Sequence, residues 1–176
     1  MSMLSRGTFA GAPAVALVAL LLGGCGKPAV IEPPPPPAVL AVAASASATV
    51  NPDAEGRPSP VMVRVYQLQD AAAFRKATLG ELWGSEAALL GPALLAQREF
   101  SLRPGDTART TMELPPSVRH LGVAAAFRDF RGGTWRAIVD VPQPAAPGST
   151  QALQVALDDN SVGARLEPVA NAGAGK

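Results

Sequence analysis

Few side chains in this 176-residue sequence have the chemistry of a catalytic site. His120 is the only histidine and Cys25 the only cysteine, which leaves no set of Cys and His ligands for a tetrahedral zinc ion. Asp129 and Asp140 could work as an acid and a base, but nearby arginines favour surface ion pairs instead. No serine lies in the pattern of a nucleophile elbow, so a hydrolase would have to depend on His120. We therefore assign no catalytic residue and expect a protein that is not an enzyme.

The composition also bears on the kinds of ligand that this protein could bind. A formal net charge of +1 offers no basic excess for phosphates, and 5% aromatic residues leave little surface for base stacking, so nucleic acid is excluded. Asp158-Asp159-Asn160 resembles part of a calcium loop without the remainder, and a turn between two strands explains it better. We expect no metal and no cofactor.

The start of the chain has the features of an export signal. Arg6 is the only charge before Lys27, and residues 14–22 form an uninterrupted apolar run. Glycine and proline make this segment too broken for a membrane-spanning helix of about 20 apolar residues, but its length suits a signal peptide. Residues 1–24 are therefore predicted to be a lipoprotein signal peptide.

The end of this signal resembles a bacterial lipobox, Leu22-Gly23-Gly24-Cys25. The resemblance implies cleavage before Cys25, which then bears a diacylglycerol and an N-acyl chain. The alternative is a lone buried thiol, an odd leftover in an exported chain. Gly26 follows where many lipoproteins retained in the inner membrane have Asp, which implies attachment to the outer membrane, facing the periplasm.

A tether is expected next, over residues 25–40, because Pro33 to Pro37 form a polyproline run that favours an extended, semi-rigid spacer. Residues 169–176 are expected to be a disordered tail. Between them, residues 41–168 alternate apolar and polar side chains over short segments separated by Pro, Gly and Asp. This pattern predicts an all-β fold, a two-sheet antiparallel β-sandwich of about eight strands. The predicted strands are 43–50, 61–66, 99–102, 108–114, 121–127, 135–141, 153–157 and 162–166.

One segment departs from the alternation, residues 70–97. It is rich in Ala and Leu and has Thr78 as its only β-branched residue. Asp70 and Ser85 stand where helix N-caps belong, and Gly84 and Gly91 stand where helices end. A small helical insert of two or three helices is predicted here.

Taken in order, several short motifs resemble the outer-membrane lipoprotein of the type VI secretion system, the TssJ (SciN-like) family. Each motif is weak alone, but their order and spacing are specific over residues 40–167. They are the lipobox, residues 51–60, residues 64–68, the insert with Phe74, Leu82 and Leu90-Gly91, then Pro104-Gly105, residues 122–129 and Trp135-Arg136.

This resemblance implies a transthyretin-like sandwich with an added helical element, anchored in the outer membrane. It implies that the partner is the periplasmic C-terminal domain of TssM, in a membrane complex that also includes TssL. In the family, the loop between the first two strands contributes to the TssM contact. That loop corresponds here to Asn51, Pro52, Asp53, Ala54, Glu55, Gly56, Arg57 and Pro58.

Strand order gives an independent geometric argument about the binding surface. In an antiparallel sandwich each strand crosses the domain, so alternate connections lie at the same end. Residues 51–60, 103–106 and 129–133 should therefore lie together, with the insert and residues 115–119 at the other end. Arg103, Asp106, Phe130 and Arg131 join the predicted binding surface on this basis. Arg103 and Asp106 could instead only shape a tight turn, and Phe130 could cover the core.

A different function remains open from the sequence alone, that of a carrier for a small apolar ligand. Alanines on two strand faces, Ala44, Ala46 and Ala48 on one and Ala124 and Ala126 on another, could leave space between the sheets. They could equally bring the sheets or the insert close together.

Overall fold

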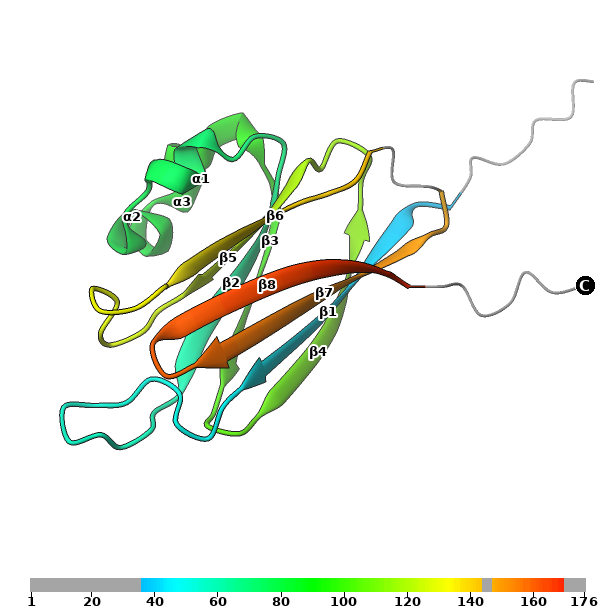
Figure 1. Ribbon diagram of the computed structural model, residues 1–176. Helices are drawn as coiled ribbons and strands as arrows, with labels where there is room; N and C mark the ends of the chain where they lie inside the picture. The colour runs from blue at the N-terminus through cyan, green and yellow to red at the C-terminus, as the bar shows by residue number, and fades with distance from the viewer. Residues whose placement is uncertain (1–35, 144–146, 170–176) are drawn as a thin grey trace, which may run out of the picture. The chain divides into compact units, whose positions relative to one another are not determined.

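The computed structural model describes residues 36–143 and 147–169 and contains eight strands in two four-stranded sheets (Figure 1). Sheet A has the order β4-β1-β7-β8 and sheet B the order β3-β2-β5-β6. The strands are β1 (Ala38–Ala46), β2 (Val61–Leu68), β3 (Leu94–Leu102), β4 (Thr107–Leu114), β5 (His120–Ala125), β6 (Arg136–Asp140), β7 (Thr150–Asp158) and β8 (Ser161–Val169).

The main core lies between the two sheets and follows from the period-two pattern of the strands. In β1 every second side chain, from Ala38 to Ala46, is buried, while the side chains between them are more exposed. The matching inward positions of β2 and β7 are Val and Leu, which suit a pleated, half-buried surface. The predicted β-sandwich is thus confirmed, with Phe100, Leu102 and Phe127 in or against this core.

Two details of the predicted sandwich are wrong. The first strand spans Ala38–Ala46 and not 43–50, so it begins inside the predicted tether, and Ala48 is exposed. The sandwich is also not purely antiparallel, because β1 and β7 pair in parallel, with Val39 opposite Thr150 and Ala46 opposite Leu157. Both strands start at the same end of sheet A, since six strands and an even number of sheet crossings separate them. Alternation alone does not reveal the direction of a pair that is so distant in the chain.

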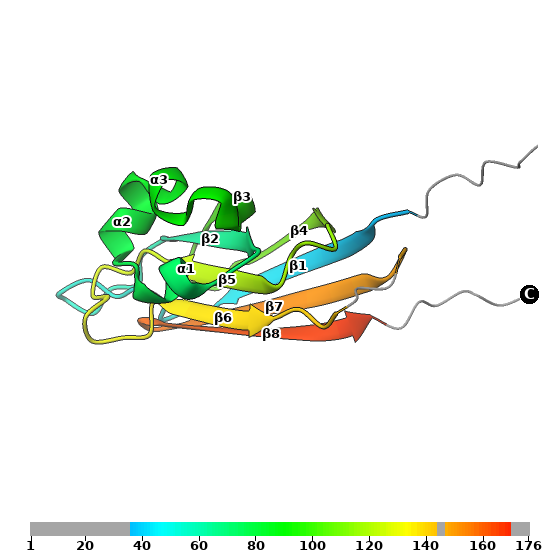
Figure 2. The same cartoon turned by 90° about the horizontal axis from the view of Figure 1, so that it is seen from above.

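The helical insert covers the face of sheet B that points away from sheet A, as Figures 1 and 2 show. It comprises α1 (Ala72–Lys76), α2 (Leu79–Gly84), α3 (Glu86–Leu90) and a 3-10 turn, η1 (Gly91–Ala93). A second apolar core forms under it from the outward side chains of sheet B and the insert. The buried members of this core are Tyr66, Leu68, Ala71, Phe74, Ala77, Leu82, Leu90 and Ala124.

The helix boundaries follow local capping chemistry, in part at residues other than those predicted. Thr78 and Glu81 form a capping box at the start of α2, with each side chain bonding the backbone N–H of the other. Asp70 accepts a 2.8 Å hydrogen bond from the N–H of Ala72. Ser85 is the N-cap of α3, but its side chain makes no capping bond.

The insert ends at Ala93, earlier than the predicted residue 97. Residues 94–97 are Ala- and Leu-rich, yet they form the first half of β3, with Leu94 opposite Leu68 and Gln97 opposite Tyr66. Pairing with a central strand of sheet B outweighs the modest helix propensity of these residues. At the other end of the chain, β8 continues to Val169, three residues past its predicted end and into the predicted tail.

Arg64 connects the insert to sheet B through a largely buried ionic network. Its side chain, 14% exposed, forms ion pairs with Glu86 of α3 and Glu99 of β3. It also donates a 2.8 Å hydrogen bond to the carbonyl oxygen of Leu82 and lies 4.9 Å from the centre of the Trp83 ring. Burial raises the pKa of neighbouring Tyr66, and the Arg64 charge acts against that rise. The insert is therefore fixed to the sheet by polar as well as apolar contacts.

Within residues 36–143 and 147–169, no helix is long and apolar enough to cross a membrane. The predicted signal peptide 1–24, Cys25, most of the tether and residues 170–176 lie outside the described residues.

Candidate partner-binding surface

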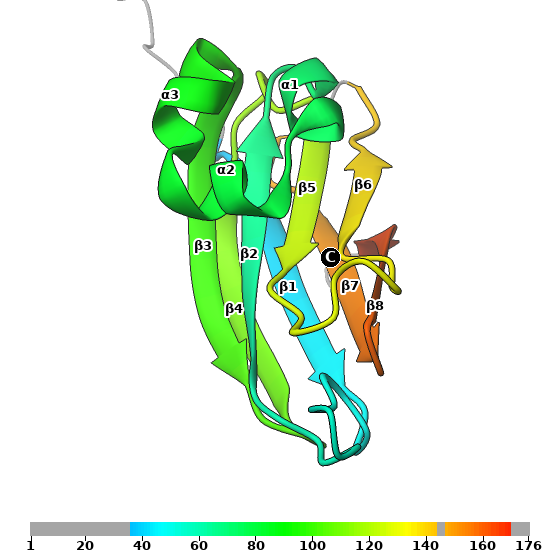
Figure 3. The ribbon, with the colours of Figure 1, turned by 90° about the vertical axis from the view of Figure 1, so that its left-hand side faces the viewer.

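Four connections meet at one end of the sandwich, which we call the loop pole: residues 47–60, 103–106, 126–135 and 159–160. Backbone hydrogen bonds join them, from Gly105 N–H to Ser47 O at 3.1 Å and from Asn51 N–H to Asp159 O at 2.7 Å. Val162 N–H donates to Thr134 O at 2.7 Å, which links β8 to the connection before β6. Figure 3 shows the first connection at the bottom of the domain, far from the start of the insert. The prediction that alternate connections share one end is confirmed.

The described chain enters the domain at the other end. Ala38 lies opposite Leu114 at the end of β4, next to the connection 115–119. The 115–119 connection bonds the far end of β2, through Arg119 N–H and Leu68 O at 2.9 Å. The loop pole therefore lies one strand length away from the point where the predicted tether joins β1, about 30 Å for nine residues at 3.3 Å each.

Asp53 organises the tip of the first connection. Its carboxylate accepts hydrogen bonds from the backbone N–H groups of Glu55 (3.0 Å) and Arg57 (2.9 Å) and from the Arg57 guanidinium (2.8 Å). These bonds, led by the one from the Arg57 N–H, hold the pKa of Asp53 below its usual value, although partial burial acts in the opposite direction. Gly56 adopts a φ of 76°, which glycine allows at no steric cost. The tip is therefore a preformed turn.

Most of the residues predicted to bind a partner are accessible on this turn. Arg57 also pairs with Glu55 at 3.0 Å, and both side chains remain more than half exposed, at 73% and 65%. A surface pair of this kind contributes little to stability, so its charges are available to a partner. Exposed with them are Ala54, Gly56 and Pro58, while Pro52 is half-buried.

Asn51 departs from the prediction because it is buried, with 2% of its surface exposed. Its side-chain N–H donates to Pro60 O at 2.7 Å, and its side-chain oxygen accepts from the N–H of Arg128 at 2.8 Å. Its φ is 51°, a conformation that Asn tolerates better than most residues. Asn51 thus holds the first connection in place and has no surface to offer a partner, which corrects its assignment as a contact residue.

Arg103 and Asp106 form a tight turn at the loop pole. The Asp106 carboxylate accepts from Arg103 N–H at 3.2 Å, and the Asp106 N–H donates to Arg103 O at 3.0 Å. Gly105 between them has a φ of 80°. Both side chains are exposed, but that of Asp106 already serves the turn. The turn-forming alternative therefore explains Asp106.

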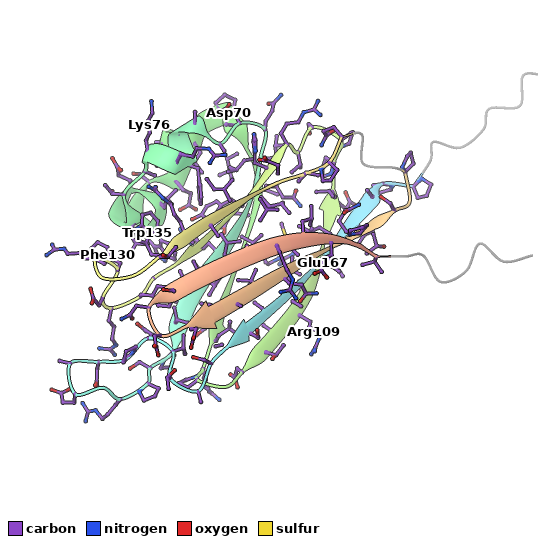
Figure 4. All side chains as sticks on the ribbon, in the orientation of Figure 1. Asp70, Lys76, Arg109, Phe130, Trp135 and Glu167 are labelled. Carbon is purple, nitrogen blue, oxygen red and sulfur yellow. The ribbon has the colours of Figure 1, made fainter. Side chains whose placement is uncertain are left out.

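Phe130 lies at the tip of the fifth connection and is 38% exposed, so it does not cover the core. The guanidinium of Arg131 lies 5.8 Å from the centre of its ring. Figure 4 shows Phe130 pointing away from the sheets, with Trp135 nearer to the domain. An exposed aromatic side chain beside an arginine is a common composition of interface anchors.

The sequence analysis missed Arg128 and the part played by the β7–β8 turn. Pro52, Asp53, Ala54, Arg128, Asp129 and Asn160 line a cleft of about 400 Å³ between three of the connections. Asp158-Asp159-Asn160 does form the turn joining the last two strands, as predicted. That turn belongs to the loop pole by the same alternation of connections, which could have identified it.

Neither alternative function gains support from the structure. The hollow that opens between the sheets beside β3 and β4 has a volume of about 160 Å³, below the roughly 300–1,000 Å³ typical of small-molecule sites. Ala44 and Ala46 lie in the packed core, and Ala124 packs beneath the insert. His120 forms a 2.7 Å contact with Asp140 on a neighbouring strand, away from the loop pole.

Comparison with known proteins identifies the family. Residues 38–160 match the family model described as "Type VI secretion lipoprotein, VasD, EvfM, TssJ, VC_A0113". No significant match occurs among curated protein sequences.

Three solved structures resemble the chain. The T6SS lipoprotein TssJ1 from Pseudomonas aeruginosa is 33% identical with a TM-score of 0.69, over 77% of this chain and 100% of that one. Serratia marcescens Lip, described as a membrane-bound component of the type VI secretion system, is 25% identical with a TM-score of 0.65, over 75% and 97%. A chain of the structure described as the T6SS protein TssM C-terminal domain (869–1107) from EAEC is 28% identical with a TM-score of 0.57, over 74% and 98%. With its eight-stranded sandwich, helical insert and family match, this chain belongs to the TssJ family of type VI secretion lipoproteins.

Proposed function

We propose that this protein is an outer-membrane lipoprotein that faces the periplasm and tethers the type VI secretion membrane complex by binding the periplasmic C-terminal domain of TssM. Within that complex, which also includes TssL, the loop pole is the TssM-binding surface. Family membership and the likeness to a chain described with the TssM C-terminal domain support this partner. The observation that supports the surface is the meeting of four connections in one preformed, hydrogen-bonded array.

Preorganisation is the physical reason to favour the loop pole. A loop that is already ordered loses little conformational entropy when a partner binds. The Asp53 turn, the prolines at positions 52, 58 and 60, and the Asn51 side chain all restrict the first connection before binding. Charged side chains and Phe130 then supply contact groups on a fixed backbone.

In this proposal, acyl chains on Cys25 hold the protein in the membrane, and the proline-rich tether gives it reach. Each buried methylene of an acyl chain adds about 0.8 kcal/mol of membrane affinity, so several chains anchor firmly. Attachment to the membrane and to TssM together makes the linkage bivalent. Cys25→Ser should therefore leave TssM binding intact in solution and abolish secretion in cells. Secretion supported by the unlipidated protein would contradict the tethering role.

The binding experiment uses the full mature lipoprotein in detergent and the cognate TssM C-terminal domain, with affinity measured by calorimetry. A triple variant, Asp53, Glu55 and Arg57 to Ala, tests the loop pole. The matched control changes Glu113, Glu167 and Arg109 to Ala, also two acidic and one basic residue. These three lie on the exposed face of sheet A, where Figure 4 labels Arg109 and Glu167.

Micromolar or tighter binding by the wild type and the control, lost in the loop variant, is the expected result. Loss in the control alone would move the binding surface to sheet A. Failure of the wild type to bind a cognate TssM domain would overturn the proposed function.

A further inference from the structure

The cleft at the loop pole contains a cation that the fold itself does not use. Pro52, Asp53 and Ala54 form one wall, and Arg128, Asp129 and Asn160 form the other. Arg128 is exposed, and within the described part of the chain its guanidinium makes no hydrogen bond and no ion pair.

The acidic groups beside it are already engaged. Both oxygens of the Asp53 carboxylate accept hydrogen bonds from Arg57 or Glu55. One oxygen of the Asp129 carboxylate accepts from the N–H of Gly132 at 3.1 Å. The Arg128 charge therefore influences the Asp53 carboxylate only from a distance.

The backbone of Arg128, in contrast, is firmly placed. Its N–H donates to the side-chain oxygen of Asn51, a residue that is itself buried and bonded to Pro60. The structural contribution of residue 128 thus comes from its peptide group, while its side chain projects into the cleft without a role in folding. Such a fixed base limits the entropy that the side chain loses on binding a partner.

We infer that Arg128 is a specificity-determining residue of the loop pole, and that its guanidinium binds a carboxylate of the partner inside this cleft. The inference rests on the proposed function, because the partner is the TssM C-terminal domain. A guanidinium matches a carboxylate with two parallel N–H···O bonds. The cleft of about 400 Å³ has room for an acidic side chain. Arginine is also among the residue types enriched at the centres of interfaces.

The test compares Arg128→Glu, Arg128→Lys and Lys76→Glu in the full mature lipoprotein, with the TssM C-terminal domain as ligand. Lys76 on α1 undergoes the same change of charge away from the loop pole, where Figure 4 labels it. Arg128→Glu should weaken binding about 100-fold, because it places two carboxylates face to face. Arg128→Lys keeps the charge but not the paired geometry and should cost about 10-fold. Lys76→Glu should change the affinity less than about threefold, as expected of a distant surface charge.

Folding does not confound this comparison, since every variant keeps the N–H that Asn51 binds; matching thermal melting curves check this. Arg128→Glu binding within about threefold of the wild type, while the Asp53, Glu55 and Arg57 variant loses binding, would overturn the inference and leave the proposed function standing. Tighter binding by Arg128→Glu would also overturn it and assign the recognition to a basic partner group. Absence of binding by the wild type would overturn both.

Discussion

The side-chain oxygen of Asn51 and the backbone N–H of Arg128 form a 2.8 Å hydrogen bond between connections that are 77 residues apart in the chain. The same Asn51 side chain bonds Pro60 O, and its backbone N–H bonds Asp159 O. One buried amide therefore connects both ends of the first connection, the fifth connection and the β7–β8 turn. The loop pole owes its single, defined arrangement to this residue more than to any charged side chain on its surface.

Replacing Asn51 should separate its two contributions. Asn51→Gly keeps the φ of 51° and leaves the Arg128 N–H and Pro60 O unpaired, which should lower the free energy of unfolding by about 1–3 kcal/mol. Asn51→Ala adds a left-handed conformation that costs a further 1–2 kcal/mol, roughly, and this exceeds the extra chain entropy of glycine. Urea denaturation of the three proteins measures both steps. Wild-type stability in the glycine variant would show that the two hydrogen bonds are dispensable.

The carboxyl group of Asp53 should titrate below its ordinary pKa of 3.8, because three hydrogen bonds favour its charged form. The sign follows directly: a lowered pKa in the folded state stabilises the turn above the unfolded pKa, and this contribution disappears as the pH falls through the folded pKa. NMR titration of the Asp53 carboxyl carbon measures the midpoint. Arg57→Ala, which removes the side-chain bond and keeps the backbone one, should move the midpoint part of the way back toward 3.8. An unchanged midpoint in that variant would assign the shift to the backbone bonds alone.

Gly133 should not tolerate a side chain. A Cβ there would lie 1.9 Å from the backbone oxygen of Asn160, so the fifth connection and the β7–β8 turn would have to separate. Gly133→Ala should lower the free energy of unfolding by about 1–3 kcal/mol and weaken TssM binding together with it. Gly80→Ala on α2 is the matched control, since a Cβ there meets no atom within 4 Å. That control should raise stability by about 0.5–1 kcal/mol, because alanine is the better helix former. Equal melting temperatures for the two variants would contradict the close approach at Gly133.

Removing Arg64 should loosen the helical insert. Arg64→Ala leaves the carboxylates of Glu86 and Glu99 without their partner in a largely buried site, which should cost about 3–5 kcal/mol. Arg109→Ala on exposed β4 should change stability by less than about 0.5 kcal/mol. Fluorescence reports the local change, because Trp83 lies against Arg64 and should shift to longer wavelength on exposure. A red shift at unchanged global stability would mean that the insert opens independently of the sandwich.

The sequence predicted most of the fold because period-two alternation reports which face of a strand is buried. It failed where a distant partner decides the local structure. Residues 94–97 have helical composition but pair with β2, and β1 begins at Ala38 because β4 and β7 flank it there. The parallel direction of β1 and β7 depends on the path of the intervening strands, which no local pattern records.

The candidate site was predictable to the level of connections and not of side chains. Parity of the connections correctly grouped the first, third and fifth, since it needs only strand count. It could not tell that Asn51 turns inward while Arg57 turns outward, because both are polar residues in one loop. Arg128 escaped notice for a related reason: its importance depends on which carboxylates around it already have partners.

The place of β1 in sheet A has a consequence for a protein that is pulled from both ends. β1 has β4 on one side and β7 on the other; the chain enters it at Ala38 and leaves it toward the loop pole at Ala46. Force between those points runs along the strand, perpendicular to the hydrogen bonds on its two flanks. Those bonds are loaded in shear and must break together, whereas an edge strand pulled sideways peels away one bond at a time. A firing secretion machine would thus strain this domain along its most resistant direction.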